Sequence, residues 1–411
     1  MEVKPGYKQT EVGVIPEEWE VKTLGSLTTL LTNGFVGTAT TAYVEGDDGV
    51  LYIQGYNVQE NGFNFHGIKR VSKAFHARNK KSCLQAGDLL TIQTGDIGVT
   101  TVIPPELVGA NCHALIISRL RKQESEPGYY CQYFNSERGR VAFKEIETGT
   151  TMKHLNGGDM KRLFLPSPPV EEQRAIATAL SDVDGLLGGL DRLIAKKRDL
   201  KQAAMQQLLT GQTRLPGFHS EWEVKRLGDV FTISAGKSKS AFIAENGDFW
   251  ICDMGSVSTE GRLIVSKRTN HRCDFLRKGD LIMPKDDIGG GNIIGKVGYI
   301  DGNETYILGD HVYCLRALEG DPRFLAFTIN SHRVNSELRK KVIGSAQLGL
   351  GRKSVTEQEI QIPPTPEQTA IAEVLTDMDA ELAAMEQRRE KTRALKQAMM
   401  QELLTGRTRL V

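Results

Sequence analysis

Two long stretches of this 411-residue chain carry apolar side chains at helical spacing. In residues 172–215 the apolar positions are Ile176, Leu180, Val183, Leu187, Leu190 and Ile194. In residues 367–410 they are Ile371, Leu375, Met378, Leu382 and Met385. Steps of three and four residues predict amphipathic helices with the seam of a coiled coil. Such helices need packing to be stable in water, so we expect them to pair with each other.

The two stretches are also copies of each other. They align without a gap at an offset of 195 residues, and 24 of the 44 aligned pairs are identical. This period is far too long for the repeat of a solenoid protein. It indicates two half-molecules, each consisting of a variable body and a shared helix.

A tryptophan segment precedes each body, and its position makes the order of elements cyclic. Residues 220–228 directly follow the tail of the first helix, whereas the matching residues 16–25 stand near the N-terminus. We therefore expect the two ends of the chain to lie close together, and the halves to be related by pseudo-twofold symmetry. We also expect Trp19 and Trp222 to pin each body to a helix.

Each body alternates short β-rich runs with turns rich in Gly, Asn and Asp, and ends in a Pro-rich hinge. The predicted fold is therefore α+β: two β-rich domains, each followed by a long helix, with the helices pairing as an antiparallel coiled coil. The expected boundaries are 1–170 and 211–365 for the β-rich domains, and 171–210 and 366–406 for the helices. We expect Gly185, Gly188 and Gly189 to mark a close approach of the second helix, with a kink as the open alternative.

The two bodies match each other only at short landmarks, and the loops between these differ in length. Divergent loops on a shared frame are typical of a recognition surface. The matched landmarks are Val71-Ser72-Lys73 with Val265-Ser266-Lys267, Gly87-Asp88-Leu89 with Gly279-Asp280-Leu281, and Asn135-Ser136 with Asn330-Ser331.

Composition excludes several classes of protein without selecting one. Hydrophobic content of 39% and charged content of 25% are ordinary for a globular protein. The sequence has no apolar run suited to a secretory signal or a membrane span. Six cysteines are scattered without a CxxC pair, which argues against a disulfide framework or a metal site. We expect a cytoplasmic protein with free thiols.

Catalytic motifs are missing from the sequence. Residues 290–296 fit the phosphate-binding pattern GxxxxGK, but Val297 stands where magnesium binding requires Ser or Thr. We find no dinucleotide-binding fingerprint and no motif of a base methyltransferase. The chain is therefore not expected to be an enzyme.

Local charge points to nucleic acid, although the net charge of +1 does not. Residues 69–81 hold six Lys or Arg and no acid, and residues 262–278 hold six against Asp274 alone. One basic run is usually a solvated face. Two at matching places are better explained as paired surfaces that contact phosphates. The candidate phosphate contacts are Lys73, Arg78, Lys80, Lys267, Arg268 and Arg272, and the candidate base-reading loop residues are Gln93, Lys153, Gln347 and Arg352.

With these features in place, the chain resembles the specificity subunit of a type I restriction–modification system. The resemblance covers essentially the whole chain. The strings that carry it are GYKQTEVGVIPEEWEVKTLG at 6–25, LPSPPVEEQRAIA at 165–177, IPPTPEQTAIA at 362–372, QQLLTGQTRLPGF at 206–218 and QELLTGRTRL at 401–410. Each string is modest by itself, but their cyclic order makes the set specific.

The resemblance implies two target-recognition domains that read the halves of a bipartite, asymmetric sequence in double-stranded DNA. It implies that the paired helices set the gap between the halves and hold two modification subunits. Those subunits would carry S-adenosylmethionine and methylate adenine. Restriction subunits that use ATP and Mg²⁺ would join them, and none of these cofactors is expected on this chain.

Two other function classes remain open at this point. One is a coiled-coil scaffold or adaptor whose bodies bind proteins. The other is a self-contained nuclease or methyltransferase, which the missing motifs disfavour. Steep salt dependence and preference for one bipartite duplex would distinguish a DNA reader from an adaptor.

Overall fold

The computed structural model describes residues 4–150, 153–287, 290–344 and 348–410 of the chain. The contacts divide it into two compact units, Met1–Arg192 with Gln387–Val411, and Leu193–Glu386. Unit 1 thus combines the first body with parts of both long helices, and unit 2 combines the second body with the remaining parts. None of the helices in the described ranges has the length and hydropathy needed to cross a membrane.

The two long helices are α6, Val170–Leu208, and α11, Thr365–Leu403. Each begins after a Pro-rich hinge and carries glutamate in its first turn, which suits the positive end of the helix dipole. In both units the two helices run antiparallel. In unit 1, Lys396 Nζ lies 2.6 Å from Asp184, and in unit 2, Lys201 Nζ lies 2.6 Å from Asp379. These are the same two positions of the repeat, so the ion pair occurs twice.

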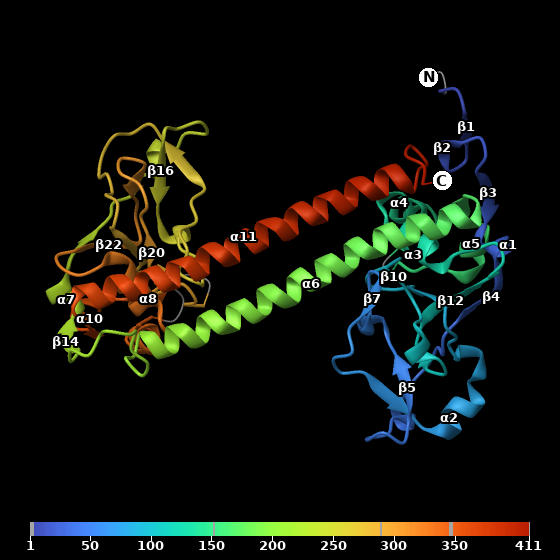
Figure 1. The fold of residues 1–411 in the computed structure, drawn as a ribbon, viewed down its shortest axis with the longest axis horizontal. Coiled ribbons are helices and arrows are strands. Elements are labelled where there is room, and N and C mark those ends of the chain that lie inside the picture. The colour runs from blue at the N-terminus through green and yellow to red at the C-terminus, as the bar shows by residue number, and fades with distance from the viewer. Residues whose placement is uncertain (1–3, 151–152, 288–289, 345–347, 411) are drawn as a thin grey trace. The chain divides into compact units, whose positions relative to one another are not determined.

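Unit 1 is built on two small sheets (Figure 1). One has the strand order β10 (Thr100–Val102), β9 (Leu89–Ile92), β12 (Leu115–Leu120) and β4 (Thr28–Asn33). The other has the order β11 (Asn111–Cys112), β5 (Val50–Ile53) and β8 (Lys69–Val71). Paired strands outside them are β1 (Tyr7–Thr10) with β2 (Gly13–Pro16), β3 (Glu20–Thr23) with β13 (Phe164–Ser167), and β6 (Val58–Gln59) with β7 (Gly62–Phe63). The short helices are α1 (Leu24–Leu27), α2 (Lys73–Arg78), α3 (Pro127–Asn135), α4 (Glu137–Ile146) and α5 (Gly157–Arg162).

Unit 2 repeats this arrangement. Its larger sheet has the order β15 (Phe231–Ala235), β22 (Val312–Ala317), β18 (Leu281–Pro284) and β20 (Gly298–Tyr299). Its smaller sheet has the order β17 (Lys267–Thr269), β16 (Phe249–Cys252) and β21 (Tyr306–Leu308). The remaining pairs are β14 (Glu223–Arg226) with β24 (Glu359–Ile362) and β19 (Asp286–Asp287) with β23 (Leu348–Gly349). The short helices are α7 (Leu227–Val230), α8 (Pro322–Asn330), α9 (His332–Lys340) and α10 (Arg352–Thr356). The predicted α+β architecture with antiparallel long helices is confirmed.

Each body packs on the long helices through a core beside them. In unit 1, the aromatic residues of α3 share a core with Ile176 and Leu180 of α6 and Leu403 of α11. In unit 2, α8 residues share a core with Leu208 of α6 and Ile371 of α11. The smaller sheets have separate cores at the end of each body away from these helix segments (Figure 1).

The two ends of the chain meet in unit 1, as the cyclic order of elements predicts. The hydroxyl of Tyr7 donates to the carbonyl of Gly406 at 3.0 Å. Trp19 is fully buried, and its indole Nε1 donates to Glu172 at 3.0 Å, at the start of α6. The expectation that a tryptophan pins the first body to its helix is confirmed.

The expected close approach at the glycines of α6 is wrong. A Cβ added to Gly185 or Gly189 would meet no atom within 4 Å, and one on Gly188 would meet only Arg192 at 3.7 Å. The glycines therefore face open space within one continuous helix.

Replacing Gly185 by alanine should raise the free energy of unfolding by about 0.5–1 kcal/mol. Alanine loses less backbone entropy on folding into a helix, and its methyl group meets nothing here. Urea denaturation of the full chain measures the change. Gly406→Ala is the matched control. It should destabilise, because Gly406 has φ +69° and its added Cβ would collide with the Pro16 ring. Equal effects of the two variants would contradict this interpretation.

Candidate nucleic-acid interface

The basic segment of unit 1 is held in place by one buried aromatic ring. Ser72 caps α2 by accepting the backbone N–H of Phe75 at 3.2 Å. The Phe75 ring packs against Phe35 and Tyr52, with ring centroids 4.9 and 5.8 Å away. This anchors α2, together with half-buried His76, whose ring Nδ1 lies 2.6 Å from Asn111 Oδ1, while Lys73 and Arg78 of the helix are exposed.

The candidate phosphate contacts of unit 1 are exposed and free of counter-charge. Lys73 and Arg78 lie on α2, and Lys80 lies in the following 3₁₀ turn, Lys80–Ser82. Among the described residues, no carboxylate lies within ion-pair distance of these three side chains. They form a compact positive patch of the kind that contacts a phosphate backbone.

The basic residues of unit 2 are more strongly engaged within the chain. Lys267 Nζ lies 2.5 Å from Asp253. The guanidinium of Arg268 stacks 3.8 Å from the ring centroid of Trp250, and that of Arg272 lies 5.4 Å from that of Phe249. Cation–π stacking preserves the positive charge of an arginine, whereas the Asp253 pair partly neutralises that of Lys267.

The landmark match between residues 71–73 and 265–267 is wrong by four positions. β8 pairs with β5 as β17 pairs with β16, so Lys69–Val71 corresponds to Lys267–Thr269. One contact confirms this register, because Arg70 donates to the carbonyl of Gly49 and Arg268 to that of Gly247. Lys73 on a helix and Lys267 on a strand are therefore not equivalent residues.

The other two landmarks are confirmed by identical contacts in both units. Asp88 pairs with Arg119 at 2.7 Å, and Asp280 pairs with Arg316 at 2.7 Å. The Asp88 carboxylate raises the pKa of Arg119 through its hydrogen bonds, and Asp280 acts in the same way on Arg316. The shared frame of the two bodies therefore includes the same ion pair, in which a partly exposed arginine meets a buried aspartate.

The asparagine of the third landmark also repeats its contacts. The side-chain amide of Asn135 forms two hydrogen bonds with the backbone of Thr100. Its oxygen accepts the N–H at 3.0 Å, and its nitrogen donates to the C=O at 2.8 Å. Asn330 does the same with Val297, at 2.8 Å for both bonds. These bonds fix the end of α3 to β10 in unit 1, and the end of α8 to the residue before β20 in unit 2.

The predicted base-reading loops meet in pairs. In unit 1, the carbonyl of Gln93 accepts the N–H of Leu155 at 2.9 Å, which brings the loop of Lys153 beside it. In unit 2, the carbonyl of Lys285 accepts the N–H of Leu350 at 2.7 Å, just before Arg352. The loop pairs are thus equivalent between the units.

The candidate side chains of these loops differ in their burial and in their partners within the chain. Gln93 is half-buried, and Lys153 Nζ lies 3.1 Å from Glu147. Arg352 is exposed but donates to the carbonyl of Ile233. Gln347 lies outside the described residues.

Exposed aromatic rings are surface features that the sequence reasoning missed. Phe65 is 54% exposed and stacks on Phe63 with centroids 5.8 Å apart. Phe242 is 47% exposed and stacks on His271 at 4.1 Å. Flat exposed rings are suited to contact sugars or bases. The signal available in the sequence was an aromatic residue within a polar segment, as in Gly62-Phe63-Asn64-Phe65.

The described residues hold no group of three or more His, Cys, Asp or Glu that could bind a metal ion. All six cysteines are free thiols.

Two segments of the chain, residues 16–194 and 219–393, each match a family model described as the type I restriction modification DNA specificity domain. Among curated proteins, the chain is 24% identical to the type I restriction enzyme MjaVIII specificity subunit of Methanocaldococcus jannaschii. That match covers 96% of this chain and 94% of the relative.

Solved structures share the fold. The S subunit of a type I restriction–modification system from M. genitalium superposes with a TM-score of 0.63 at 17% identity, covering 98% of both chains. A chain from a structure describing complex assembly and conformational transition of a type I system gives 0.55 at 18% identity, covering 95% of this chain and 99% of the other. The likeness extends over both units and both long helices.

Proposed function

The chain belongs to the type I restriction–modification DNA specificity subunits, and from this we propose that each unit reads one half of a bipartite, asymmetric DNA target. As a specificity subunit it carries DNA sequence-recognition domains and is not the catalytic component. The proposal rests on one observation: the two units share the same buried contacts but differ in their surfaces. The buried contacts of Asp88 and Asn135 recur at Asp280 and Asn330, whereas the basic segments around Lys73 and Lys267 differ.

The long helices are proposed to act as the spacer between the two half-sites. Each helix has 39 residues and so a length of about 58 Å at 1.5 Å per residue. This exceeds one ~34 Å turn of duplex DNA, so two readers joined by such helices can address successive major-groove faces.

The same helices are proposed to hold the other subunits, namely two modification subunits and the restriction subunits. Support comes from apolar side chains that the chain leaves uncovered. Leu186, Leu193 and Leu200 follow each other at seven-residue steps on α6 and are 44%, 40% and 47% exposed. A leucine stripe at heptad spacing is suited to pack against a partner helix. S-adenosylmethionine, ATP and Mg²⁺ are proposed to reside on these partners.

The direct test is to map methylated adenines in DNA modified by this chain together with its modification partner. We expect two short, different half-sites separated by a constant gap. Modification of a single uninterrupted site, or without sequence preference, would refute the bipartite proposal. Binding that is insensitive to salt would instead favour the adaptor function.

Replacing Lys73 by alanine should weaken binding to every DNA sequence and lower the slope of log affinity against log salt by about one unit. Lys73 is exposed and has no carboxylate partner among the described residues, so its charge is available to a phosphate. Fluorescence anisotropy of the assembled complex over a salt series measures the slope. Lys122→Ala, an exposed lysine in the turn after β12, is the control and should leave it unchanged. A slope unaltered by Lys73→Ala would remove this residue from the interface.

A further inference from the structure

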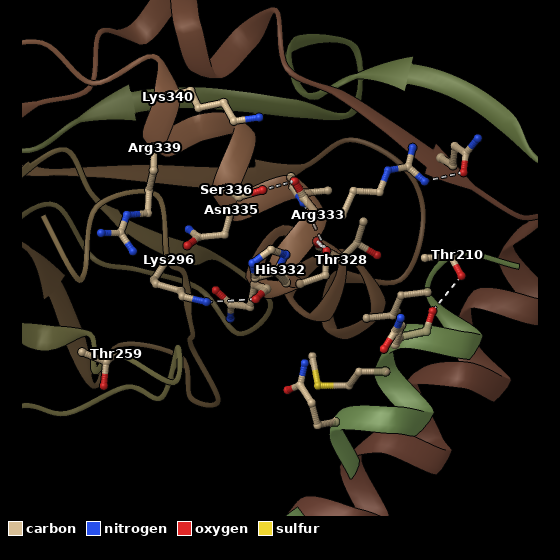
Figure 2. Close-up of a pocket in the computed structure, with 18 of the residues that line it drawn as sticks. Thr210, Thr259, Lys296, Thr328, His332, Arg333, Asn335, Ser336, Arg339 and Lys340 are labelled. Carbon is tan, nitrogen blue, oxygen red and sulfur yellow. Dashed lines mark hydrogen bonds between the residues drawn. The ribbon is translucent and has the colours of Figure 1, made fainter. Parts of the chain in front are cut away.

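A cleft of about 930 Å³ opens in unit 2 between the C-terminal part of α6 and helix α9 (Figure 2). One wall is the α6 face that carries Gln202, Met205 and Gln206. The opposite wall is the end of α8 and the start of α9, and Lys296 closes it from the loop before β20. The cleft takes no part in the candidate interface described above.

The charge inside this cleft has one sign. The lining residues include Lys296, Arg333, Arg339 and Lys340, together with His332, and among the described lining residues there is no Asp or Glu. Two of these cations have partners within the chain. Arg333 donates to the neutral amide of Gln361 at 2.8 Å, and Lys340 pairs at 2.6 Å with Glu337, which is not part of the lining. No carboxylate of the described residues lies within ion-pair distance of Lys296 or Arg339.

Lys296 and Arg339 both contribute positive charge to the lining of this cleft (Figure 2). The ammonium of Lys296 donates to the backbone carbonyl of Asn330 at 3.0 Å, which fixes its position. Burial lowers the pKa of Lys296, and the charge of Arg339 lowers it further, while Glu260 acts weakly in the opposite direction. Both cations line the same cleft, so an anion bound there would be attracted by both.

Two further features of the cleft favour a ligand with acceptor oxygens. The first turn of α9 lines it with Ser331, His332 and Arg333, so the positive end of this nine-residue helix adds to the field. The Thr328 side chain is 97% buried, and its Oγ1 has no hydrogen-bond partner in the structure. Thr328 belongs to the lining, and a buried hydroxyl without a partner is costly unless something satisfies it.

The equivalent cleft of unit 1 provides an internal comparison. Its α11 wall carries Gln397, Met400 and Gln401, which are the repeat copies of Gln202, Met205 and Gln206. Its other wall differs, because Glu60 there pairs with Arg140. Further lining carboxylates are Glu11, Glu137 and Glu145. The lining of the unit 1 cleft thus includes five carboxylates, Asp184 among them, whereas the described lining of the unit 2 cleft includes none.

We propose that the cleft of unit 2 is a phosphate-binding site centred on Lys296 and Arg339, and that the cleft of unit 1 is not. The phosphoryl group is the shared chemistry of two sources, a free phosphate and a backbone phosphate of duplex DNA. Phosphate matches two cations that point into a cleft, a helix N-terminus and neutral hydroxyl and amide donors. The DNA source rests on the proposed function, whereas the free-phosphate source does not.

The test uses the full chain with Lys296→Gln and Arg339→Gln, each alone. Isothermal titration with inorganic phosphate examines the free source. Salt-dependent binding of a random-sequence duplex by the complex with its modification partner examines the DNA source. Arg339→Lys keeps the charge, and Lys144→Gln changes the position of unit 1 that corresponds to Arg339. Arg339 and Lys144 are both exposed, so neither change should disturb the fold.

For a free phosphate, we expect a roughly tenfold or greater loss of phosphate affinity with Arg339→Gln, near-normal affinity with Arg339→Lys, and no change with Lys144→Gln. For a DNA phosphate, each Gln variant should lower the salt slope by about 0.9, equally for all sequences. The proposal is overturned if neither phosphate nor duplex binding responds to the Gln variants, or if Lys144→Gln weakens binding as much as Arg339→Gln. A wild-type complex without sequence preference would refute the proposed function but leave the phosphate titration interpretable.

Discussion

Replacing Arg214 by alanine should destabilise the chain far more than removing one partner of an exposed ion pair would. Arg214 lies after α6 and holds the Glu367 carboxylate at the start of α11 through two hydrogen bonds of 2.5 and 2.6 Å. The Glu367 side chain is 1% exposed. Removing the guanidinium leaves a buried carboxylate without a counter-charge, which is much more costly than losing a surface pair. Urea denaturation measures the free energy of unfolding.

The equivalent ion pair in unit 1 provides a second arginine variant whose loss of stability should be smaller. Arg409 holds the fully buried Glu172 with bonds of 2.6 and 2.8 Å, but Glu172 also accepts the indole N–H of Trp19. In unit 2, Trp222 Nε1 has no hydrogen-bond partner. Arg409→Ala should therefore cost less than Arg214→Ala, because one partner of the carboxylate remains.

A second variant separates buried charge from lost packing. Adding Glu367→Gln to Arg214→Ala removes the unpaired charge and should restore a large part of the stability. If the double variant is no more stable than Arg214→Ala alone, the cost comes from lost contacts of the arginine and the buried-charge explanation is wrong.

Lengthening both long helices by one heptad should widen the gap in the recognised DNA sequence by about three base pairs. Seven residues add about 10.5 Å of helix, and a base pair occupies about 3.4 Å. The insertions belong after Arg192 and after Glu386, where the two compact units divide. At these points the pairs Lys396–Asp184 and Lys201–Asp379 keep their register within each unit. A heptad also nearly preserves the helix face, because it turns the helix by about 20° from two full turns.

Methylated-adenine mapping with the lengthened chain measures the outcome. Both half-sites should keep their sequence while the gap grows. A heptad inserted in α6 alone is the control, since it would shift one helix against the other and break one set of pairs. A changed half-site with an unchanged gap would show that the helices are not the spacer.

The parts of the fold that could be predicted are those in which the same type of residue makes the same contact at each repeat of a pattern. The long helices follow from the apolar seam, since Ile176, Leu180 and Ile371 are buried as their spacing requires. The landmarks with Asp88 and Asn135 are also confirmed. Few other residue types can replace an aspartate that pairs with an arginine, or an asparagine that bonds both backbone groups of one residue. These contacts depend on specific polar atoms, and such atoms are visible in a sequence.

Other predictions failed because they depended on strand register or on the direction in which a residue faces. Neither can be read from the sequence alone. Val71-Ser72-Lys73 matched Val265-Ser266-Lys267 in letters, but strand register decides equivalence, and valine fits many positions of a sheet. The glycines of α6 suggested a close contact, but their orientation around the helix points them to open space. The cleft of unit 2 could not be foreseen, because its lining comes from residues between 202 and 361 that only the tertiary fold brings together.

The repeated ion pairs have a consequence for how this chain could have arisen. Asp184 and Lys201 both lie in the first long helix, and they are the same residue types as Asp379 and Lys396 in the second. The same is true of Glu172 and Arg214 with respect to Glu367 and Arg409. A half-length ancestor could thus have formed a homodimer in which Asp184 of each copy met Lys201 of the other. If each unit reads one half-site as proposed, such a dimer would have read a palindrome, and fusion of two copies of its gene would have let each half diverge toward a different sequence.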